Sequence, residues 1–82
     1  MQNYPNPFNP TTVIKWSLKE AAFVTLKIYD VMGREVGTYV NEKLNIGIYE
    51  TTFDGSDLSS GVYYYKLQAG NFTDTKKMML IK

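Results

Sequence analysis

The chain has 82 residues, of which 44% are hydrophobic and 15% aromatic, a composition typical of one small globular domain with a thin core rather than of a disordered segment. Nine basic and eight acidic residues leave a net charge of +1, which argues against nucleic acid as a partner because neutralising phosphates requires a basic stripe. The lack of Cys and His excludes a disulfide framework, a zinc-finger ligand set, a thiolate nucleophile and the commonest general base.

The first eleven residues are expected to form a lead in front of the domain proper, which we place at residues 12–82. All three prolines of the chain lie in this lead, where they lack a backbone N–H and favour extended geometry in the residues before them. We therefore predict a proline-rich linker that also supplies a first edge strand rather than a central one. The side chains that can pin the lead onto the domain are Phe8 and Tyr4.

Two strands with a clean period of two follow the lead. Residues 12–18 and 24–29 alternate apolar with polar side chains, which is the pattern of a half-buried strand. Lys19-Glu20-Ala21 is predicted to form the turn between them. The side chains expected to face the core are Ile14, Trp16, Leu18, Val24, Leu26 and Ile28.

A tight turn and a weaker strand come next. Asp30-Val31-Met32-Gly33 is predicted to end the second strand, with Gly33 supplying the permissive backbone. Residues 35–42 are predicted as a third strand, which Gly37 interrupts. Asn45-Ile46-Gly47 marks the following turn.

Three further strands complete the chain. One is centred on residues 49–53 and ends in the polar turn at 54–57. Residues 62–69 and 72–81 are predicted to form a hairpin around Gly70-Asn71, a favoured two-residue turn. The side chains expected to face the core are Tyr49, Thr51, Phe53, Tyr63, Tyr65, Leu67, Ala69, Met78 and Leu80.

The regular spacing of these segments predicts the fold. Six strands and the edge strand of the lead make about seven strands at intervals near ten residues, and no segment shows a helical stripe. We therefore predict an all-β domain, an immunoglobulin-like antiparallel β-sandwich. Gly61-Val62-Tyr63 has the spacing of a tyrosine corner, in which the Tyr63 hydroxyl bonds a backbone group a few residues upstream. The alternative is that Tyr63 simply fills the core.

No arrangement of residues indicates catalysis. Asp54 and Asp57 flank a Gly-Ser turn, where Asp is expected to bond the backbone, and calcium ligation is the alternative. Asp30 and Asp74 could approach each other as a pair of carboxylates. Asn71 begins a glycosylation sequon, although the hairpin turn already explains this residue. We therefore expect no enzyme, no cofactor and no metal.

Five short motifs in this chain match those of one family in order and spacing. The motifs are Asn3-Tyr4-Pro5-Asn6-Pro7-Phe8-Asn9-Pro10, Ile28-Tyr29-Asp30-Val31-Met32-Gly33-Arg34-Glu35-Val36, Gly47-Ile48-Tyr49 with Phe53-Asp54, Leu58-Ser59-Ser60-Gly61-Val62-Tyr63-Tyr64-Tyr65-Lys66-Leu67, and Thr75-Lys76-Lys77-Met78-Met79-Leu80-Ile81-Lys82. On these residues the chain resembles the type A C-terminal sorting domain of the type IX (Por) secretion system. It is also similar to the related immunoglobulin-like domain of flagellar hook-capping proteins. The residues that the resemblance marks as motif positions are Pro5, Asn6, Pro7, Phe8, Tyr29, Asp30, Gly33, Arg34, Gly47, Tyr49, Gly61 and Tyr63.

The resemblance implies a role in sorting. Such domains end proteins that Bacteroidetes and their relatives export across the outer membrane. The parent protein would enter the periplasm by its own signal peptide. An outer-membrane translocon would then recognise the sorting domain as the cargo moves to the cell surface or the medium. The chain would thus be covalently part of a larger cargo, and no signal peptide is expected at Met1.

The C-terminal strand is predicted to carry the recognition. A terminal strand at a sheet edge offers free backbone groups and accessible side chains to a partner. Ordinary strand packing is the alternative, and the lysine pair within it is also typical of a solvated edge strand. The residues expected to be recognised by the translocon are Lys76, Lys77, Met79, Ile81 and Lys82.

Two other functions remain open from the sequence. The chain could be a structural or adhesive module of an extracellular assembly, with homo-association through its edge strands. It could also be a carbohydrate-binding accessory module, which would require Tyr29, Tyr39 and Tyr64 to lie exposed in one plane. A position at the end of a reading frame would favour the sorting role over the structural one.

Overall fold

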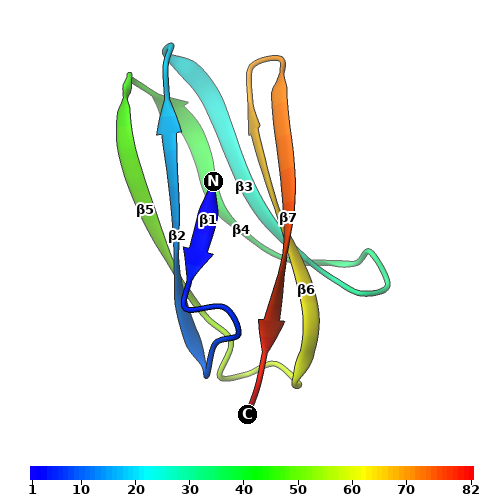
Figure 1. The fold of residues 1–82 in the computed structure, drawn as a ribbon. Helices are drawn as coiled ribbons and strands as arrows, with labels where there is room; N and C mark the ends of the chain where they lie inside the picture. The colour runs from blue at the N-terminus through cyan, green and yellow to red at the C-terminus, as the bar shows by residue number, and fades with distance from the viewer.

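The computed structural model describes all 82 residues and confirms the predicted sandwich of two antiparallel sheets (Figure 1). One sheet has the strand order β1-β2-β5 and the other has the order β4-β3-β6-β7. No helix with the length and hydropathy of a membrane span occurs. The strands are β1 (Gln2–Tyr4), β2 (Thr11–Leu18), β3 (Ala22–Asp30), β4 (Glu35–Leu44), β5 (Gly47–Asp54), β6 (Gly61–Ala69) and β7 (Phe72–Leu80).

The core lies between the inner faces of the two sheets and consists of alternate residues along the strands. All the predicted inward residues of β2, β3, β6 and β7 are buried, as their period of two requires. The inner row of β5 is buried only at Phe53, because β5 is the edge strand of its sheet, and Tyr49 and Thr51 are half-buried there. Tyr49 stacks on Trp16 with ring centroids 4.6 Å apart.

Strand β4 is longer and less regular than predicted. It continues to Leu44, and register shifts in its pairing with β3 indicate bulges. Gly37 lies within this strand, paired with Ile28, and does not interrupt it as predicted. A glycine is needed at this position for a steric reason, because a Cβ at Gly37 would come within 3.1 Å of the Tyr39 ring that covers it. The glycine therefore makes room for an aromatic side chain two residues further on.

The lead is joined to both sheets of the sandwich. Strand β1 pairs with β2, and Phe8 is buried with its ring 5.8 Å from that of Phe53. Asn3 faces inward and accepts a hydrogen bond from the Tyr65 hydroxyl across the sandwich, 3.1 Å away. The prediction that Tyr4 pins the lead was wrong, since Tyr4 is 77% exposed. It follows Asn3 in the strand and so points to the opposite side. The division at residue 12 stays a prediction.

Candidate functional site

Strand β7 alternates between the core and the surface along its last residues. Met78 and Leu80 are each 1% exposed, which confirms their predicted inward orientation. Met79 and Ile81 are 41% and 48% exposed, and Lys77 is exposed as well. Because alternate residues share a face, Lys77 and Met79 lie together on the outer face of the four-stranded sheet, and the exposed Ile81 follows directly after the strand. We call these three residues the outer row.

The outer row has defined neighbours on the adjacent strand β6. Tyr64 is the register partner of Lys77, and Val62 is the partner of Met79. Both neighbours are half-buried, so they support the exposed side chains of β7 without covering them. The outer row is therefore a mixed basic and apolar strip on an ordered sheet.

The other two residues of the predicted recognition set lie apart from this row. Lys76 is the register partner of Tyr65, so its side chain leaves the strand on the inner side of the sheet, at the open edge of the sandwich. Lys82 is held by the loop before β6: its amide donates to Ser60 Oγ at 3.1 Å, and its ammonium donates to the Ser56 carbonyl. The structure thus brings together three of the five predicted residues and separates the remaining two.

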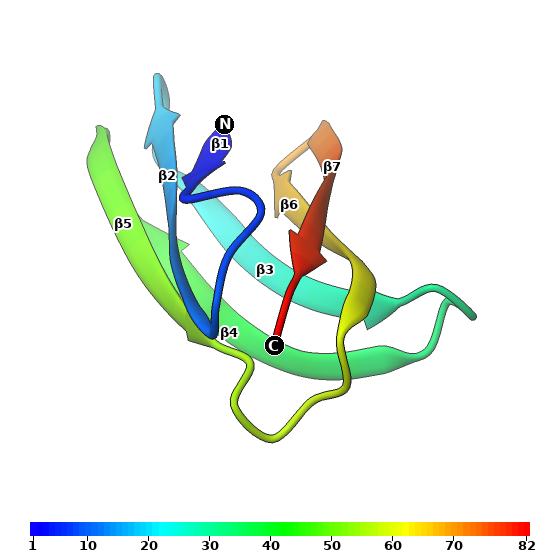
Figure 2. The same ribbon diagram turned by 60° about the horizontal axis from the view of Figure 1, so that its bottom comes forward.

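The lead covers part of the edge of β7. The amide of Phe8 donates to the Met79 carbonyl, and the amide of Ile81 donates to the Phe8 carbonyl, both at 2.9 Å. The side chain of Asn6 accepts from the Met79 amide at 3.1 Å and donates to the Lys77 carbonyl at 3.3 Å. Figure 2 shows the loop after β1 lying beside the end of β7. We call Asn6–Phe8 the clasp.

The clasp corrects the expectation that the C-terminal strand has a free edge. Four outward backbone groups, from the Lys77 carbonyl to the Ile81 amide, are bonded to the clasp. Backbone groups alternate in direction along a strand, so those of Thr73 and Thr75 point the same way, and no strand pairs with them there. Only the first half of β7 is therefore available for pairing with another chain.

The turn after β3 explains the central motif through its own hydrogen bonds. Asp30 Oδ1 accepts from the amides of Met32 and Arg34, and Arg34 Nε donates to Asp30 Oδ2, each at 2.9 Å. The bond from the Arg34 amide contributes most to lowering the pKa of Asp30, with the guanidinium adding to the effect. Gly33 has a φ of +82°, a backbone conformation that favours glycine. These residues therefore stabilise a turn.

Two strands of the domain begin with the same Gly-x-Tyr arrangement. The Tyr63 hydroxyl donates to the Ser59 carbonyl at 2.7 Å, which confirms the predicted tyrosine corner. The Tyr49 hydroxyl donates to the Asn45 carbonyl at 2.6 Å, again four residues upstream. The sequence repeats the pattern visibly, yet the second instance was not predicted. Both tyrosines serve as fold residues that hold the preceding loop.

The tyrosines that a carbohydrate-binding surface would need do not share a face. Tyr29 and Tyr64 are register partners on the outer face of the four-stranded sheet. Tyr39 instead packs edge-on against the inward ring of Phe53, with centroids 5.4 Å apart. The structure therefore does not meet the condition that the carbohydrate-binding alternative requires.

The acidic residues considered for chemistry are also separated or used locally. Asp30 pairs with Tyr63 and Asp74 pairs with Leu67, positions on β6 that are about 13 Å apart at strand spacing, so these two carboxylates do not meet. Asp54 accepts from the Ser56 amide at 2.9 Å, as expected of a turn residue. No group of three or more potential metal-binding side chains gathers anywhere in the structure.

Comparison with known proteins places this sandwich within a class of secreted-protein modules. The family described as the secretion system C-terminal sorting domain matches residues 2–82. The chain belongs to this family of type IX sorting signals, a family that is not catalytic. It is accordingly part of a larger cargo protein that the secretion system recognises and exports to the cell surface or the extracellular space. No curated protein and no solved structure matches the chain.

Proposed function

We propose that this domain directs its cargo from the periplasm through the outer-membrane translocon of the type IX system, and that it has no catalytic role of its own. The observation that carries the proposal is the family match over residues 2–82. The domain would act as a folded tag, whose surface is recognised by a binding partner of the secretion machinery. The proposal gives no catalytic reaction to any acidic, basic or nucleophilic side chain of the domain.

The outer row is the surface that we propose the translocon binds. Met78 and Leu80 fix the strand into the core, so Lys77, Met79 and Ile81 stand in defined positions on the outside. A row of one cation followed by two exposed apolar side chains can provide both electrostatic attraction and buried contact area to a partner. Lys76 and Lys82 belong to the same predicted set, but their separate positions allow their part in recognition to be tested independently.

A secretion assay tests this assignment without removing a strand. A fluorescent reporter with an N-terminal export signal would carry the chain at its C-terminus in a host with a working type IX system. Truncation after Thr75 is unsuitable, because it would remove Met78 and Leu80 from the core. The informative variant is the double substitution Lys77→Glu with Met79→Ser. Its matched control is Lys76→Glu, which makes the same charge change on the other side of β7.

The proposal predicts secreted reporter for the original chain and for the control, with periplasmic retention of the outer-row variant. Thermal unfolding of each purified domain would show first that the variants are folded. Retention of the original chain, while an established sorting domain is secreted, would overturn the sorting function for this chain. Equal secretion of all three would keep the function and reject the outer row as the recognised surface.

A further inference from the structure

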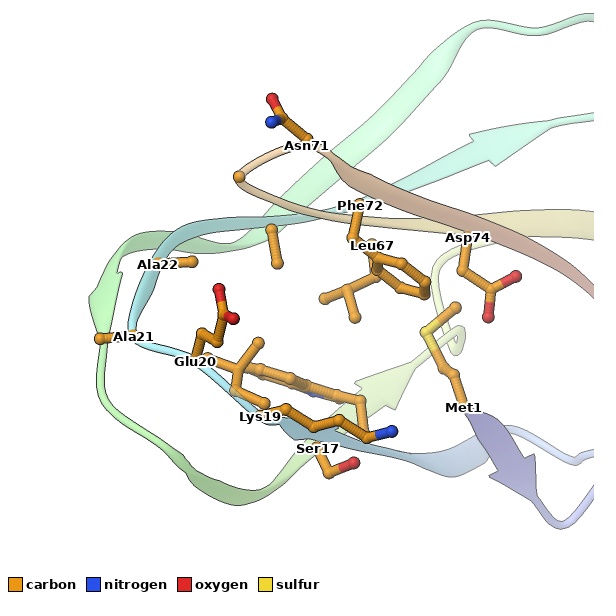
Figure 3. Close-up of a pocket in the computed structure, with 14 residues that line it drawn as sticks. Met1, Ser17, Lys19, Glu20, Ala21, Ala22, Leu67, Asn71, Phe72 and Asp74 are labelled. Carbon is orange, nitrogen blue, oxygen red and sulfur yellow. The ribbon is translucent and has the colours of Figure 1, made fainter.

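A cleft of about 680 Å³ opens at one side of the sandwich and has no occupant within the chain. Its walls come from both sheets, with Trp16 and Leu18 on β2 facing Leu67 on β6 and Phe72 on β7. Figure 3 shows Met1 at one end of this cleft; at the other end are Ala21, in the turn that joins β2 to β3, and Asn71, in the hairpin turn between β6 and β7. The walls are mainly apolar, so the cleft suits an apolar side chain better than a charged one.

The N-terminal end of strand β1 lies at this cleft. It pairs with β2 only as far as Gln2 opposite Lys15, whereas β2 continues to Leu18. Beyond Lys15 no strand neighbours β2 on this side. Since β1 runs out of the cleft toward the clasp, any residues that precede Met1 would enter the cleft along the unpaired edge of β2. An extended β1 would satisfy backbone groups there.

A second observation at this site is an unpartnered polar atom. Trp16 is 4% exposed, and its indole Nε1–H has no hydrogen-bond acceptor. Buried donors without an acceptor are rare in folded proteins, because each one loses its bond to water without replacement. A segment lying in the cleft would bring backbone carbonyls close to this side chain, which lines the cleft wall.

We propose that the cargo segment directly before residue 1 occupies this cleft as an extension of β1. The inference rests on the proposed function, in which the cargo is joined to the N-terminal side of the domain. Continuing the observed register puts Met1 opposite Trp16 and the second residue before Met1 opposite Leu18. That second residue therefore faces inward, like Asn3 and Met1, and is apolar. The first residue before Met1 lies opposite Ser17 and faces solvent.

The attached segment is a better occupant than a strand from another copy. Its effective concentration at the cleft is high because it is covalently joined to β1, and β1 already sets its register. A strand from a second copy would have to pair with β2 beside Met1, which already lines one end of the cleft. The join between cargo and tag is then a paired strand rather than a free linker.

The test compares four forms of the purified domain. The first is residues 1–82, and the second carries in addition the six residues that precede them in the parent protein. The third replaces the second residue before Met1 by Asp, and the fourth, as matched control, replaces the first residue before Met1 by Asp. We expect the native extension to raise Tm by about 5 °C, as burial of one apolar side chain and added strand pairing would do in a domain of this size. Nuclear Overhauser contacts should join the inward residue to Leu18.

The inward Asp should remove the rise in Tm and the contacts, whereas the outward Asp should retain both. The proposal is overturned if the native extension changes neither, or if the two Asp forms behave alike. It is also overturned if sedimentation shows that residues 1–82 dimerise and that the rise in Tm follows protein concentration, which would assign the cleft to a second copy. These measurements use no secretion machinery, so failure of the secretion assay and failure of this test are distinct results.

Discussion

The two halves of β7 solve the problem of an exposed sheet edge in different ways. In the second half, from Lys77 to Leu80 and on to the following Ile81, the clasp bonds four outward backbone groups, with two main-chain bonds and two bonds from the Asn6 side chain. In the first half, Phe72 to Lys76, β6 pairs with one edge of the strand and nothing pairs with the other edge. Edge strands are usually protected by charges, prolines or coverage. Strand β7 thus has one end whose edge is covered and another whose edge is open, so the two ends can serve different roles.

The difference between the two halves concerns how firmly each part of β7 is held and which part presents the proposed contact surface. The covered half is fixed from two directions, by the burial of Met78 and Leu80 and by the clasp at its edge. Its outer row is consequently presented from a rigid backbone, which reduces the ordering cost of binding. The open half borders the cleft, and Phe72 of this half contributes to the cleft wall. Four measurements test this difference between the two halves.

The largest effect is expected from removing the aromatic anchor of the clasp. Phe8→Ala deletes a ring that is 2% exposed and in edge contact with Phe53. We expect it to lower the free energy of unfolding by about 3–5 kcal/mol in urea titration. Tyr4→Ala, in the same segment but 77% exposed, should change it by less than about 0.5 kcal/mol. Equal effects of the two substitutions would show that the clasp is not anchored through Phe8.

The stability of the fold is expected to depend on pH at the boundary between the halves, where Tyr65 faces Lys76. Burial, with a smaller contribution from Asp74, raises the pKa of Tyr65 from 10.0 to about 12. Because the folded pKa is raised, the contribution to stability is complete below pH 10 and is lost as pH rises from 10 to about 12. Urea midpoints measured across this range should fall for the original chain and fall less for Tyr65→Phe. Parallel declines would contradict the assignment to Tyr65.

A smaller effect is expected from the side-chain part of the clasp. Asn6→Ala removes the acceptor of the Met79 amide and the donor to the Lys77 carbonyl, while Phe8 stays in place. Because these bonds are exposed, we expect a loss of about 1 kcal/mol in the free energy of unfolding. Asn9→Ala, an exposed asparagine in the same lead, is the matched control and should be near neutral. The comparison fails if both variants lose the same stability.

The smallest perturbation is to measure amide hydrogen exchange in the unmodified chain. The amides of Met79 and Ile81 are bonded to the clasp, whereas those of Thr73 and Thr75 face the open edge. We expect exchange at the two threonines to be faster by at least about tenfold. Slow exchange at Thr73 or Thr75 that depends on protein concentration would reveal pairing between copies along the open half.

The sheets were predictable because period two and apolar character agree along most strands. Trp16, Leu26, Tyr65 and Met78 all lie inside, where alternation put them. The Tyr63 corner was predictable from the local spacing Gly-x-Tyr, and the same spacing could have revealed the corner at Tyr49. Most of the fold could therefore be predicted from local sequence patterns.

The features that were missed depend on contacts between distant parts of the sequence. The bonds from Asn6 to β7 join residues more than 70 positions apart, and no periodic pattern announces them. The separation of Lys76 from Lys77 is a different case. Adjacent residues in a strand face opposite sides, so the sequence alone indicated that the pair could not act as one patch. Lys76 and Lys77 were grouped because both are basic, and this overlooked that their side chains leave the strand on opposite sides.

The clasp also determines how the domain would respond to mechanical force. The cargo is joined near β1, whereas the proposed contact surface is on β7, so tension between them runs through the chain ends. The shortest path passes from the lead to the last strand through the four bonds of Asn6 and Phe8 and the buried Phe8 ring. We expect β1 and the clasp to detach first under load, while β2 to β7 remain folded. A tag built this way would yield first at its junction with the cargo, while Met78 and Leu80 still hold the contact strand in the core.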